Sequence, residues 1–208
     1  MRPLVVTDCD EVLLHMARHF RDWLAEEHAV EFLLHGEPFR HSLRRTTGEP
    51  LAEEEIWPYL HAFFDSQMAN QTPIEGAVAA IVELQREADV VVLTNLQDRF
   101  SESRRAQLLA VGIDAPVYTN QGPKGAAIRR IVQDLGRERP AVFIDDLAQH
   151  HASAAEMQPT IGRLHFCGEP AIAGQIPCAL RDGHAHARID NWQEALPWLL
   201  ERLHGEQR

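Results

Sequence analysis

The chain has 208 residues, 45% of them hydrophobic and 25% charged, which is enough for one α/β domain with a substantial core and one insertion. Its formal charge of −11 disfavours a polyanionic partner, so we expect no nucleic acid polymer as a ligand. No apolar run approaches the roughly 18 to 20 residues that span a bilayer, no secretory leader is recognised, and the three cysteines form no CxxC pair. We therefore expect a cytoplasmic protein with reduced thiols, no structural zinc site and no membrane partner.

Short runs of aliphatic and β-branched residues predict five strands. From the second strand onward, helical patterns of roughly 10 to 15 residues separate them. Apolar strands linked by amphipathic helices are typical of a parallel sheet covered by helices on both faces, so the sequence predicts a doubly wound α/β fold. The predicted strands are Leu4–Thr7, Val90–Thr94, Pro116–Thr119, Ala141–Ile144 and Arg163–Cys167.

The alternation of strands and helices is interrupted once, directly after the first strand. About sixty residues there contain no convincing strand and predict two helices, His15–His28 and Ala52–Ala69, joined by a loop with Gly and Pro signals. We expect residues 14–72 to form an all-helical cap over the carboxyl end of the first strand. Residues 1–13 and 73–208 should form the catalytic core.

Pairs of aspartates follow two of the predicted strands. Asp8 and Asp10 come after the first strand, and Asp145 and Asp146 come after the fourth. The carboxyl ends of parallel strands are where such sheets bind ligands. Grouped carboxylates are unfavourable unless a cation lies between them, and magnesium takes carboxylate oxygens as ligands. The pattern indicates a magnesium site, with a helix N-cap as the other common role for Asp145 or Asp146.

Three further residues stand where an anion could bind. Thr94 and Asn95 close an apolar run, and a hydroxyl with nearby backbone N–H groups can hold phosphate oxygens. Lys124 lies at the start of a helical pattern, where its charge is mildly unfavourable unless an anion or carboxylate is close. Taken singly, Thr94 could merely end a strand and Lys124 could be a solvated surface residue.

In combination, these elements resemble the haloacid dehalogenase superfamily. Its pattern is an apolar strand with DxDx[TV], a strand that ends in Ser or Thr, a lysine, and a strand that ends in acids. The matching residues are Asp8-Cys9-Asp10-Glu11-Val12, Thr94, Lys124 and Asp145-Asp146. One difference is Glu11, which stands where many members have glycine, and we expect its side chain to point into solvent.

The resemblance implies a role for each matching residue. Asp8 would be the nucleophile that forms an aspartyl-phosphate, and Asp10 would protonate the leaving oxygen and then deprotonate water. Thr94 and Lys124 would hold the transferring phosphoryl group. The implied Mg²⁺ ligands are Asp8, the backbone carbonyl of Asp10, Asp145 and, directly or through water, Asp146.

The expected function is hydrolysis of a small phosphorylated metabolite, a phosphomonoester, by a monomer or homodimer that uses Mg²⁺. A phosphotransferase or mutase would use the same residues. A 2-haloacid dehalogenase shares the fold and the nucleophile but requires neither Asp10 nor magnesium. A non-catalytic binding protein with this fold would be expected to have lost some of the acids.

Substrate specificity is expected to come from the insertion, whose length resembles the small C1-type caps of deoxyribonucleotidase-like and phosphoglycolate phosphatase-like members. Arg44 and Arg45, in the loop of the insertion, are candidate substrate-binding residues, since arginine forms bidentate contacts with anions. A solvated loop is the alternative. We expect the aromatic residues of the insertion to form its core rather than to bind a ligand. They are Phe20, Trp23, Trp57, Phe63 and Phe64.

Overall fold

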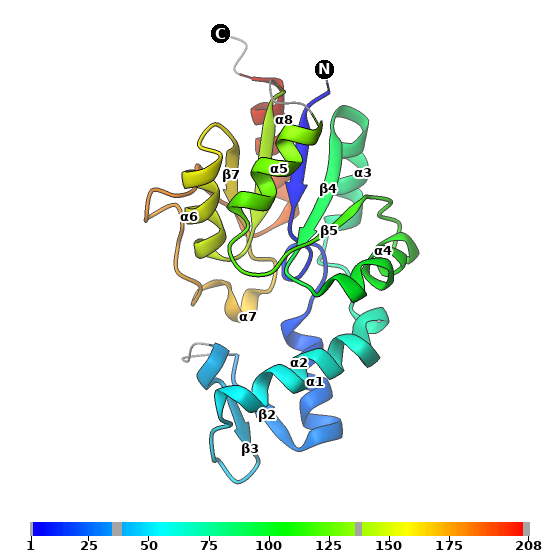
Figure 1. Cartoon of the computed structure of the whole chain (residues 1–208), viewed down its shortest axis with the longest axis vertical. Coiled ribbons are helices and arrows are strands. Elements are labelled where there is room, and N and C mark those ends of the chain that lie inside the picture. The colour runs from blue at the N-terminus through cyan, green and yellow to red at the C-terminus, as the bar shows by residue number, and fades with distance from the viewer. Residues whose placement is uncertain (1, 35–38, 136–138, 206–208) are drawn as a thin grey trace.

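A six-stranded parallel sheet with the order β5-β4-β1-β6-β7-β8 forms the centre of the molecule (Figure 1). The structure is a computed structural model that describes residues 2–34, 39–135 and 139–205. The strands are β1 (Leu4–Thr7), β4 (Asp89–Thr94), β5 (Val117–Thr119), β6 (Ala141–Asp145), β7 (Gly162–His165) and β8 (Ala187–Arg188). No helix within the described ranges is long and apolar enough to cross a membrane.

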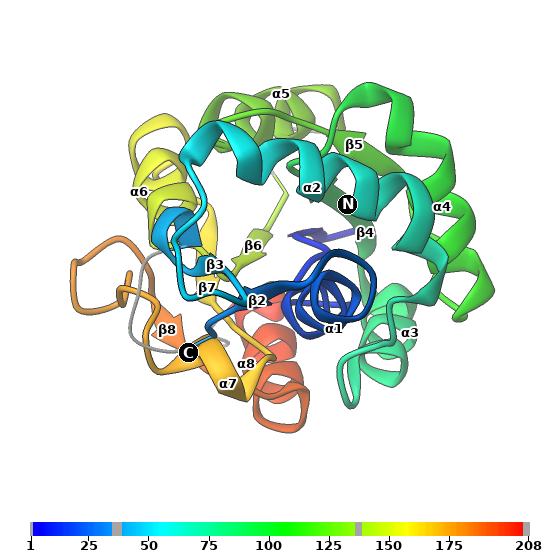
Figure 2. The same cartoon turned by 90° about the horizontal axis from the view of Figure 1, so that it is seen from below.

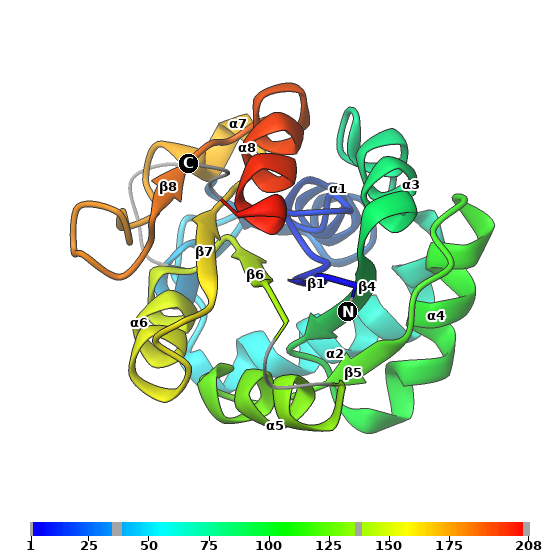
Figure 3. The ribbon, with the colours of Figure 1, turned by 90° about the horizontal axis from the view of Figure 1, so that it is seen from above.

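Helices cover both faces of this sheet, as Figure 3 shows, with α3 and α8 on one side and α5 and α6 on the other. The predicted doubly wound α/β fold is therefore confirmed. The helices of the core are α3 (Ala77–Glu87), η3 (Asp98–Phe100), α4 (Ser101–Ala110), α5 (Gly125–Leu135), α6 (Ala148–Met157), α7 (Pro170–Ala173) and α8 (Trp192–His204).

Strand β1 illustrates why uninterrupted apolar runs form the central strands. Successive side chains of a strand point to opposite faces of the sheet. Val5 packs into the cluster that contains α3 and α8, whereas Leu4 and Val6 pack into the cluster that contains α5 and α6. All three are 0% exposed. Because both faces are buried, a polar residue without a hydrogen-bond partner is unfavourable at any position of the strand.

The insertion after β1 forms a separate layer at the carboxyl end of the sheet, as Figure 2 shows from below. It contains α1 (Ala17–His28), β2 (Val30–Phe32), η1 (Phe39–His41), β3 (Leu43–Arg45), α2 (Glu53–Gln67) and η2 (Met68–Asn70). Strands β2 and β3 pair in antiparallel orientation, so the expectation of an all-helical insertion is wrong. Strands of three residues are too short to show an alternating pattern. Val30 and Leu43 are buried in a cluster that includes residues of α1 and α2.

The insertion has its own hydrophobic core. Four of the aromatic residues that we expected there are buried, whereas Trp57 is 48% exposed. The buried four are Phe20, Trp23, Phe63 and Phe64. Leu96 and Phe100 from the sheet domain join the same cluster, so the insertion packs directly onto the core.

The chain enters and leaves the insertion through two segments that lie side by side. The amide of His15 donates to the carbonyl of Thr72 at 2.9 Å, and the amide of Ile74 donates to the carbonyl of Leu13 at 2.9 Å. The covalent connection between the insertion and the core therefore consists of two backbone segments that are hydrogen-bonded to each other.

Candidate active site

Polar side chains from three strands meet at the carboxyl edge of the sheet. Strand β1 lies between β4 and β6, so the residues that end these strands are neighbours in space. Asp8 follows β1, Thr94 ends β4, and Asp145 ends β6. The amide of Asp8 donates to the carbonyl of Ile144 at 2.8 Å, which extends the strand pairing up to the candidate nucleophile.

Lys124 is fully buried and lies between two of the carboxylates. Its Nζ is 2.7 Å from Oδ1 of Asp8 and 2.7 Å from Oδ2 of Asp145. Lys124 directly precedes α5, which packs closely on α6: a Cβ at Gly125 would lie 2.2 Å from the carbonyl oxygen of Ser153. Glycine at this position therefore allows the helix to bring Lys124 to the site, and the alternative of a solvated surface lysine is excluded.

The cluster holds more negative charge than Lys124 balances. Burial raises the pKa of Asp8 to about 7, against the opposing effect of Lys124, and Asp145 raises it further. Burial, with the charges of Asp145 and Asp8, holds the pKa of Asp146 well above its usual range. Burial also acts to raise the pKa of Asp145, but Lys124 together with His150 and His151 outweighs it, and the pKa is lowered. A further cation would favour the ionised form of all three carboxyl groups.

The three carboxylates fit a magnesium ion. Asp8, Asp145 and Asp146 each offer an oxygen, and these atoms lie within 4.8 Å of one another. Asp8 and Asp145 are oriented by backbone amides, since Oδ1 of Asp8 accepts from Cys9 and Oδ1 of Asp145 accepts from Leu147. Asp146 is 7% exposed, and its carboxylate accepts no hydrogen bond from the described residues. An all-oxygen ligand set is the kind that magnesium prefers.

Thr94 offers a free hydrogen-bonding group beside these acids, whereas the side chain of Asn95 is engaged elsewhere. Thr94 is 1% exposed, and its Oγ1 has no partner among the described residues. An unsatisfied buried hydroxyl costs about 1–3 kcal/mol, which a ligand oxygen would offset. Nδ2 of Asn95 donates to the carbonyl of Gly122 at 3.0 Å, and Asn120 donates to its Oδ1 at 2.8 Å. The side chain of Asn95 thus holds the loop after β5.

Arg104 on α4 is a member of the site that the sequence motifs do not reveal. It is 0% exposed, and its Nη2 lies 2.9 and 3.1 Å from the two carboxylate oxygens of Asp10. Its Nη1 donates to Oε1 of Gln71 at 3.0 Å and to Oε1 of Gln107 at 2.8 Å. Gln71 also donates to Asp10, at 3.1 Å. The carboxylate of Asp10 is therefore held both by the core and by the exit segment of the insertion.

Glu11 does not point into solvent, so that expectation is wrong. The residue is 3% exposed, with a φ of 58°, and its Oε1 accepts hydrogen bonds from the amides of Met16 at 2.9 Å and Ala17 at 2.5 Å. The first amides of a helix need acceptors, and the Met16 side chain at the N-cap of α1 provides no cap hydrogen bond. Glu11 supplies the missing acceptor from the preceding loop.

The two candidate substrate-binding arginines lie on β3, and the expectation of a loop at this position is wrong. In Figure 1, β3 is at the bottom of the insertion and the six-stranded sheet is above it. In the register of the hairpin, Arg44 lies opposite Glu31. Nη2 of Arg45 lies 2.5 Å from Oε1 of Glu55. Arg45 therefore joins β3 to the first turn of α2.

No protein-family model matches the sequence, and no curated protein matches it. Solved structures do match. A haloacid dehalogenase-like family hydrolase from Streptococcus pneumoniae has a TM-score of 0.64 and 13% identity, covering 94% of this chain and 97% of that chain. The chain has the haloacid dehalogenase fold. A defluorinating L-2-haloacid dehalogenase shares this fold, with a TM-score of 0.58, 13% identity and coverage of 96% of both chains.

A third structure with the haloacid dehalogenase fold is the D,D-heptose 1,7-bisphosphate phosphatase from B. bronchiseptica, complexed with magnesium and phosphate. Its TM-score is 0.53 at 14% identity, and the match covers 96% of this chain and 98% of that chain. Proteins with different activities thus share this fold. The activity of the present chain has to be inferred from the residues of its own site.

Proposed function

We propose that this protein is a Mg²⁺-dependent hydrolase of a small phosphomonoester that acts through an aspartyl-phosphate on Asp8. The observation that carries the proposal is the position of Lys124, 2.7 Å from both Asp8 and Asp145, with Asp146 in the same cluster. A nucleophilic carboxylate, a fixed positive charge and ligands for a divalent metal are the parts that phosphoryl transfer requires.

In the first step, a carboxylate oxygen of Asp8 attacks phosphorus and the bond from phosphorus to the leaving oxygen breaks. Asp10 gives its proton to that leaving oxygen, so the product alcohol departs neutral. Lys124 favours the ionised form of Asp8, and the unpaired hydroxyl of Thr94 donates to a phosphoryl oxygen.

In the second step, water attacks the phosphorus of the aspartyl-phosphate. Asp10, now ionised, takes the proton from this water, and the bond between phosphorus and the Asp8 oxygen breaks. Inorganic phosphate leaves, and Asp8 is again a carboxylate. One residue therefore serves as acid in the first step and as base in the second, which requires that its carboxylate stay in place between the steps.

Arg104 acts in this scheme as a positioning residue for Asp10. It is buried, and its guanidinium is held in turn by Gln71 and Gln107, so it is not free to follow a displaced carboxylate. Asp10, in contrast, retains 18% exposure of its side chain, which leaves one side open toward a substrate.

A magnesium ion held by Asp8, Asp145, Asp146 and the backbone carbonyl of Asp10 would neutralise charge on the phosphoryl group. The surplus of buried carboxylates over positive charge supports this assignment. The phosphatase with the same fold is complexed with magnesium and phosphate, which is consistent with it.

Two rival activities differ from phosphate ester hydrolysis. Dehalogenation makes no use of Asp10 as an acid, and phosphoryl transfer uses an acceptor other than water. A 2-haloacid dehalogenase attacks carbon and needs no acid at the leaving group, so the presence of Asp10, held in place by Arg104 and Gln71, favours a phosphatase. A phosphotransferase would use the same residues and deliver the phosphoryl group to an alcohol instead of water.

The test is a panel of phosphomonoesters incubated with the full chain and Mg²⁺, with release of inorganic phosphate as the readout. We expect turnover of at least one ester and loss of both turnover and trapped phosphoenzyme in Asp8→Asn. Asp134→Asn, a change at an exposed position of α5, is the matched control and should retain activity. Dehalogenation of a 2-haloacid without any phosphate release would overturn the proposal, as would phosphoryl transfer to an added alcohol without hydrolysis.

A further inference from the structure

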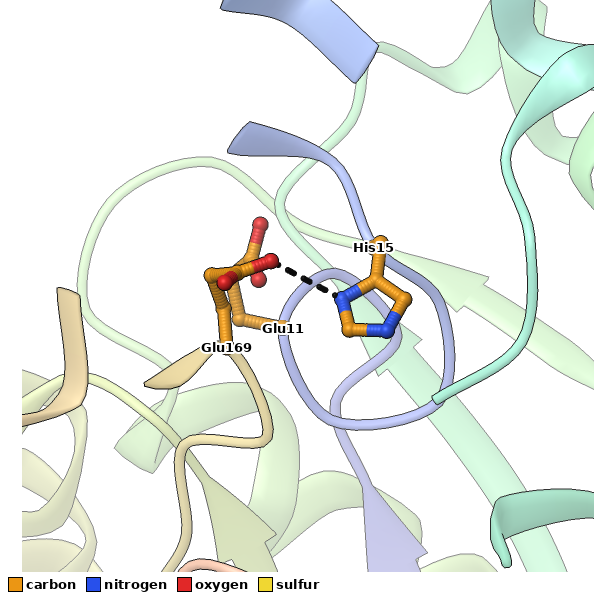
Figure 4. Close-up of side chains that lie close together, drawn as sticks. All are labelled: Glu11, His15 and Glu169. Carbon is orange, nitrogen blue, oxygen red and sulfur yellow. Dashed lines mark ion pairs between the residues drawn. The ribbon is translucent and has the colours of Figure 1, made fainter. Parts of the chain in front are cut away.

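A second group of metal-ligating side chains lies at the junction between the insertion and the core. It consists of Glu11, His15 and Glu169, and none of the three has a part in the proposed hydrolysis. Each offers one ligand atom, and these atoms lie within 4.8 Å of one another. Figure 4 shows the carboxylates of Glu11 and Glu169 grouped together, with the imidazole of His15 beside them. All three residues are buried.

The carboxylate of Glu11 is fixed at one oxygen and unpaired at the other. Oε1 accepts the two amides at the start of α1, which orients the group. Oε2 is buried and has no hydrogen-bond partner among the described residues. A buried carboxyl oxygen without a hydrogen-bond partner is unfavourable, and the carboxylate of Glu169 belongs to the same group. The unpaired atom therefore marks a place for a positively charged ligand.

The other two side chains are also held in a ligand-binding arrangement. Oε1 of Glu169 accepts the amide of Ala171 at 3.2 Å, and Oε2 lies 3.1 Å from Nδ1 of His15. Ligand atoms at about 2.1 Å from a tetrahedral ion are roughly 3.4 Å apart, close to this separation. Oε2 of Glu169 also contacts Nε of Arg18 at 2.6 Å. The Arg18 side chain is 41% exposed, so it can turn into solvent when a cation takes its place.

We propose that Glu11, His15 and Glu169 bind a divalent transition-metal ion of the zinc class, at a site separate from the magnesium site. One imidazole nitrogen and two carboxylate oxygens suit zinc and its neighbours, whereas magnesium prefers oxygen alone. Two carboxylates neutralise the divalent charge, so a neutral complex can be buried there. Three protein ligands leave a fourth position for water.

The three ligands come from two segments that are far apart in the sequence. Glu11 and His15 belong to the segment between β1 and α1, which leads into the insertion, and Glu169 belongs to the loop before α7. A bound ion would therefore cross-link the entry to the insertion with a distant loop of the core. Binding to the folded form alone raises stability, so the site has a readout that does not depend on catalysis.

The experiment uses the full chain with saturating Mg²⁺, so that the acids at the sheet edge are occupied. Zn²⁺ is titrated by calorimetry, and Co²⁺ is titrated by visible absorbance. We expect one equivalent of Zn²⁺ to bind and raise the thermal midpoint. We expect His15→Gln and Glu169→Gln each to weaken this binding at least about tenfold, as loss of one ligand should.

Two controls separate this site from other sources of binding. His19 lies in α1, close to His15 in the sequence but outside the ligand group, and contacts Thr72, so His19→Gln should leave Zn²⁺ binding unchanged. Asp145→Asn should lose Mg²⁺ binding and phosphatase activity but retain the Zn²⁺ equivalent, so failure of one proposal does not imply failure of the other. Unchanged Zn²⁺ affinity in both His15→Gln and Glu169→Gln, or no binding to the unmodified chain, overturns the proposal.

X-ray absorption of the Zn²⁺-loaded unmodified chain tests the same assignment without any substitution that could impair folding. The expected coordination shell contains nitrogen and oxygen only, with the outer scattering that one imidazole produces. A sulfur neighbour would place the ion at a cysteine and would overturn the proposal.

Discussion

Arg104 contacts both carboxylate oxygens of Asp10, at 2.9 and 3.1 Å, from a fully buried position on α4. This contact links the residue proposed as acid and base to α4, whose Gln107 also holds Arg104. Gln71, in the exit segment of the insertion, is hydrogen-bonded to both Asp10 and Arg104. The position of Asp10 is thus fixed jointly by core and insertion.

Replacement of this arginine should mimic loss of the proton shuttle. In Arg104→Met we expect kcat/KM for an alkyl phosphate to fall by about 10² or more, because Asp10 loses its orienting partner. The loss should be smaller for an aryl phosphate, whose leaving group needs no proton, and Arg104→Lys should recover part of the activity. Arg105→Met, at the exposed neighbouring position, is the control. If Arg104 had a purely structural role, its replacement would lower kcat/KM equally for the two substrates.

The two acids of the first motif should differ in their dependence on the leaving group. Asp8→Asn should abolish phosphoenzyme formation for every substrate. Asp10→Asn should impair an alkyl phosphate far more than an activated aryl phosphate, because only the former depends on a proton at the leaving oxygen. Steady-state kinetics with the two ester types measure this difference. Equal slowing of both esters by Asp10→Asn would contradict the proton-shuttle assignment.

Magnesium should stabilise the protein as well as activate it. At a free Mg²⁺ concentration of 100 times Kd, binding to the folded form alone adds about 2.7 kcal/mol to the free energy of unfolding. Asp145→Asn should lose this effect, and Asp134→Asn should retain it. Thermal unfolding with and without Mg²⁺ gives the shift, and excess chelator should abolish phosphate release. Full turnover in chelator is the contrary result.

His151 should make the protein less stable in acid. Burial lowers its pKa from 6.5 to about 4, so the folded state keeps it neutral while the unfolded chain takes up a proton. Because its pKa is lower in the folded state, stability is lost as pH falls from about 6.5 to about 4, by an amount on the order of 3 kcal/mol. His151→Gln should flatten this part of the pH profile. Urea unfolding at pH 7 and pH 4.5 measures it, and His41→Gln, at an exposed position, should leave the profile unchanged.

The double substitution of Arg44 and Arg45 by Ala tests whether the insertion selects the substrate. If β3 contacts the leaving group, KM for the natural ester should rise while a small generic ester is nearly unaffected. Loss of the Arg45 contact to Glu55 should also lower the thermal midpoint slightly, by the modest amount typical of a half-exposed ion pair. The matched control replaces Arg129 and Arg130, both exposed on α5. Equal effects on both esters would remove these arginines from substrate recognition.

The fold was predictable from sequence wherever burial on both faces produced an uninterrupted apolar run. Strand β1 is such a run, and its end placed Asp8 correctly at the edge of the sheet. Strands β2 and β3 are not predicted because three residues are too few to show a hydrophobic period. Their buried residues pack against α1 and α2. The two-residue strand β8 was missed for the same reason.

The contacts of the site were harder to predict than its motif residues. Arg104, Gln107 and Leu108 share one face of α4, and the buried leucine could have indicated that this face is turned inward. An adjacent arginine, Arg105, is exposed, and composition alone does not distinguish the two. Glu11 was misjudged because its burial depends on the unpaired amides of α1, which only the path of the backbone brings to it.

The paired junction of Leu13–His15 with Thr72–Ile74 makes the insertion modular. Because both ends meet across backbone hydrogen bonds of 2.9 Å, a turn of about four residues could close the core where the insertion now begins. Removal of the insertion would expose Leu96 and Phe100 to solvent. Both would then need replacement by polar residues to prevent aggregation of the truncated protein. A different lid could be grafted at the same two points without altering the sheet, and if it again supplied the Gln71 contacts to Asp10 and Arg104, specificity could diverge while the chemistry stays fixed.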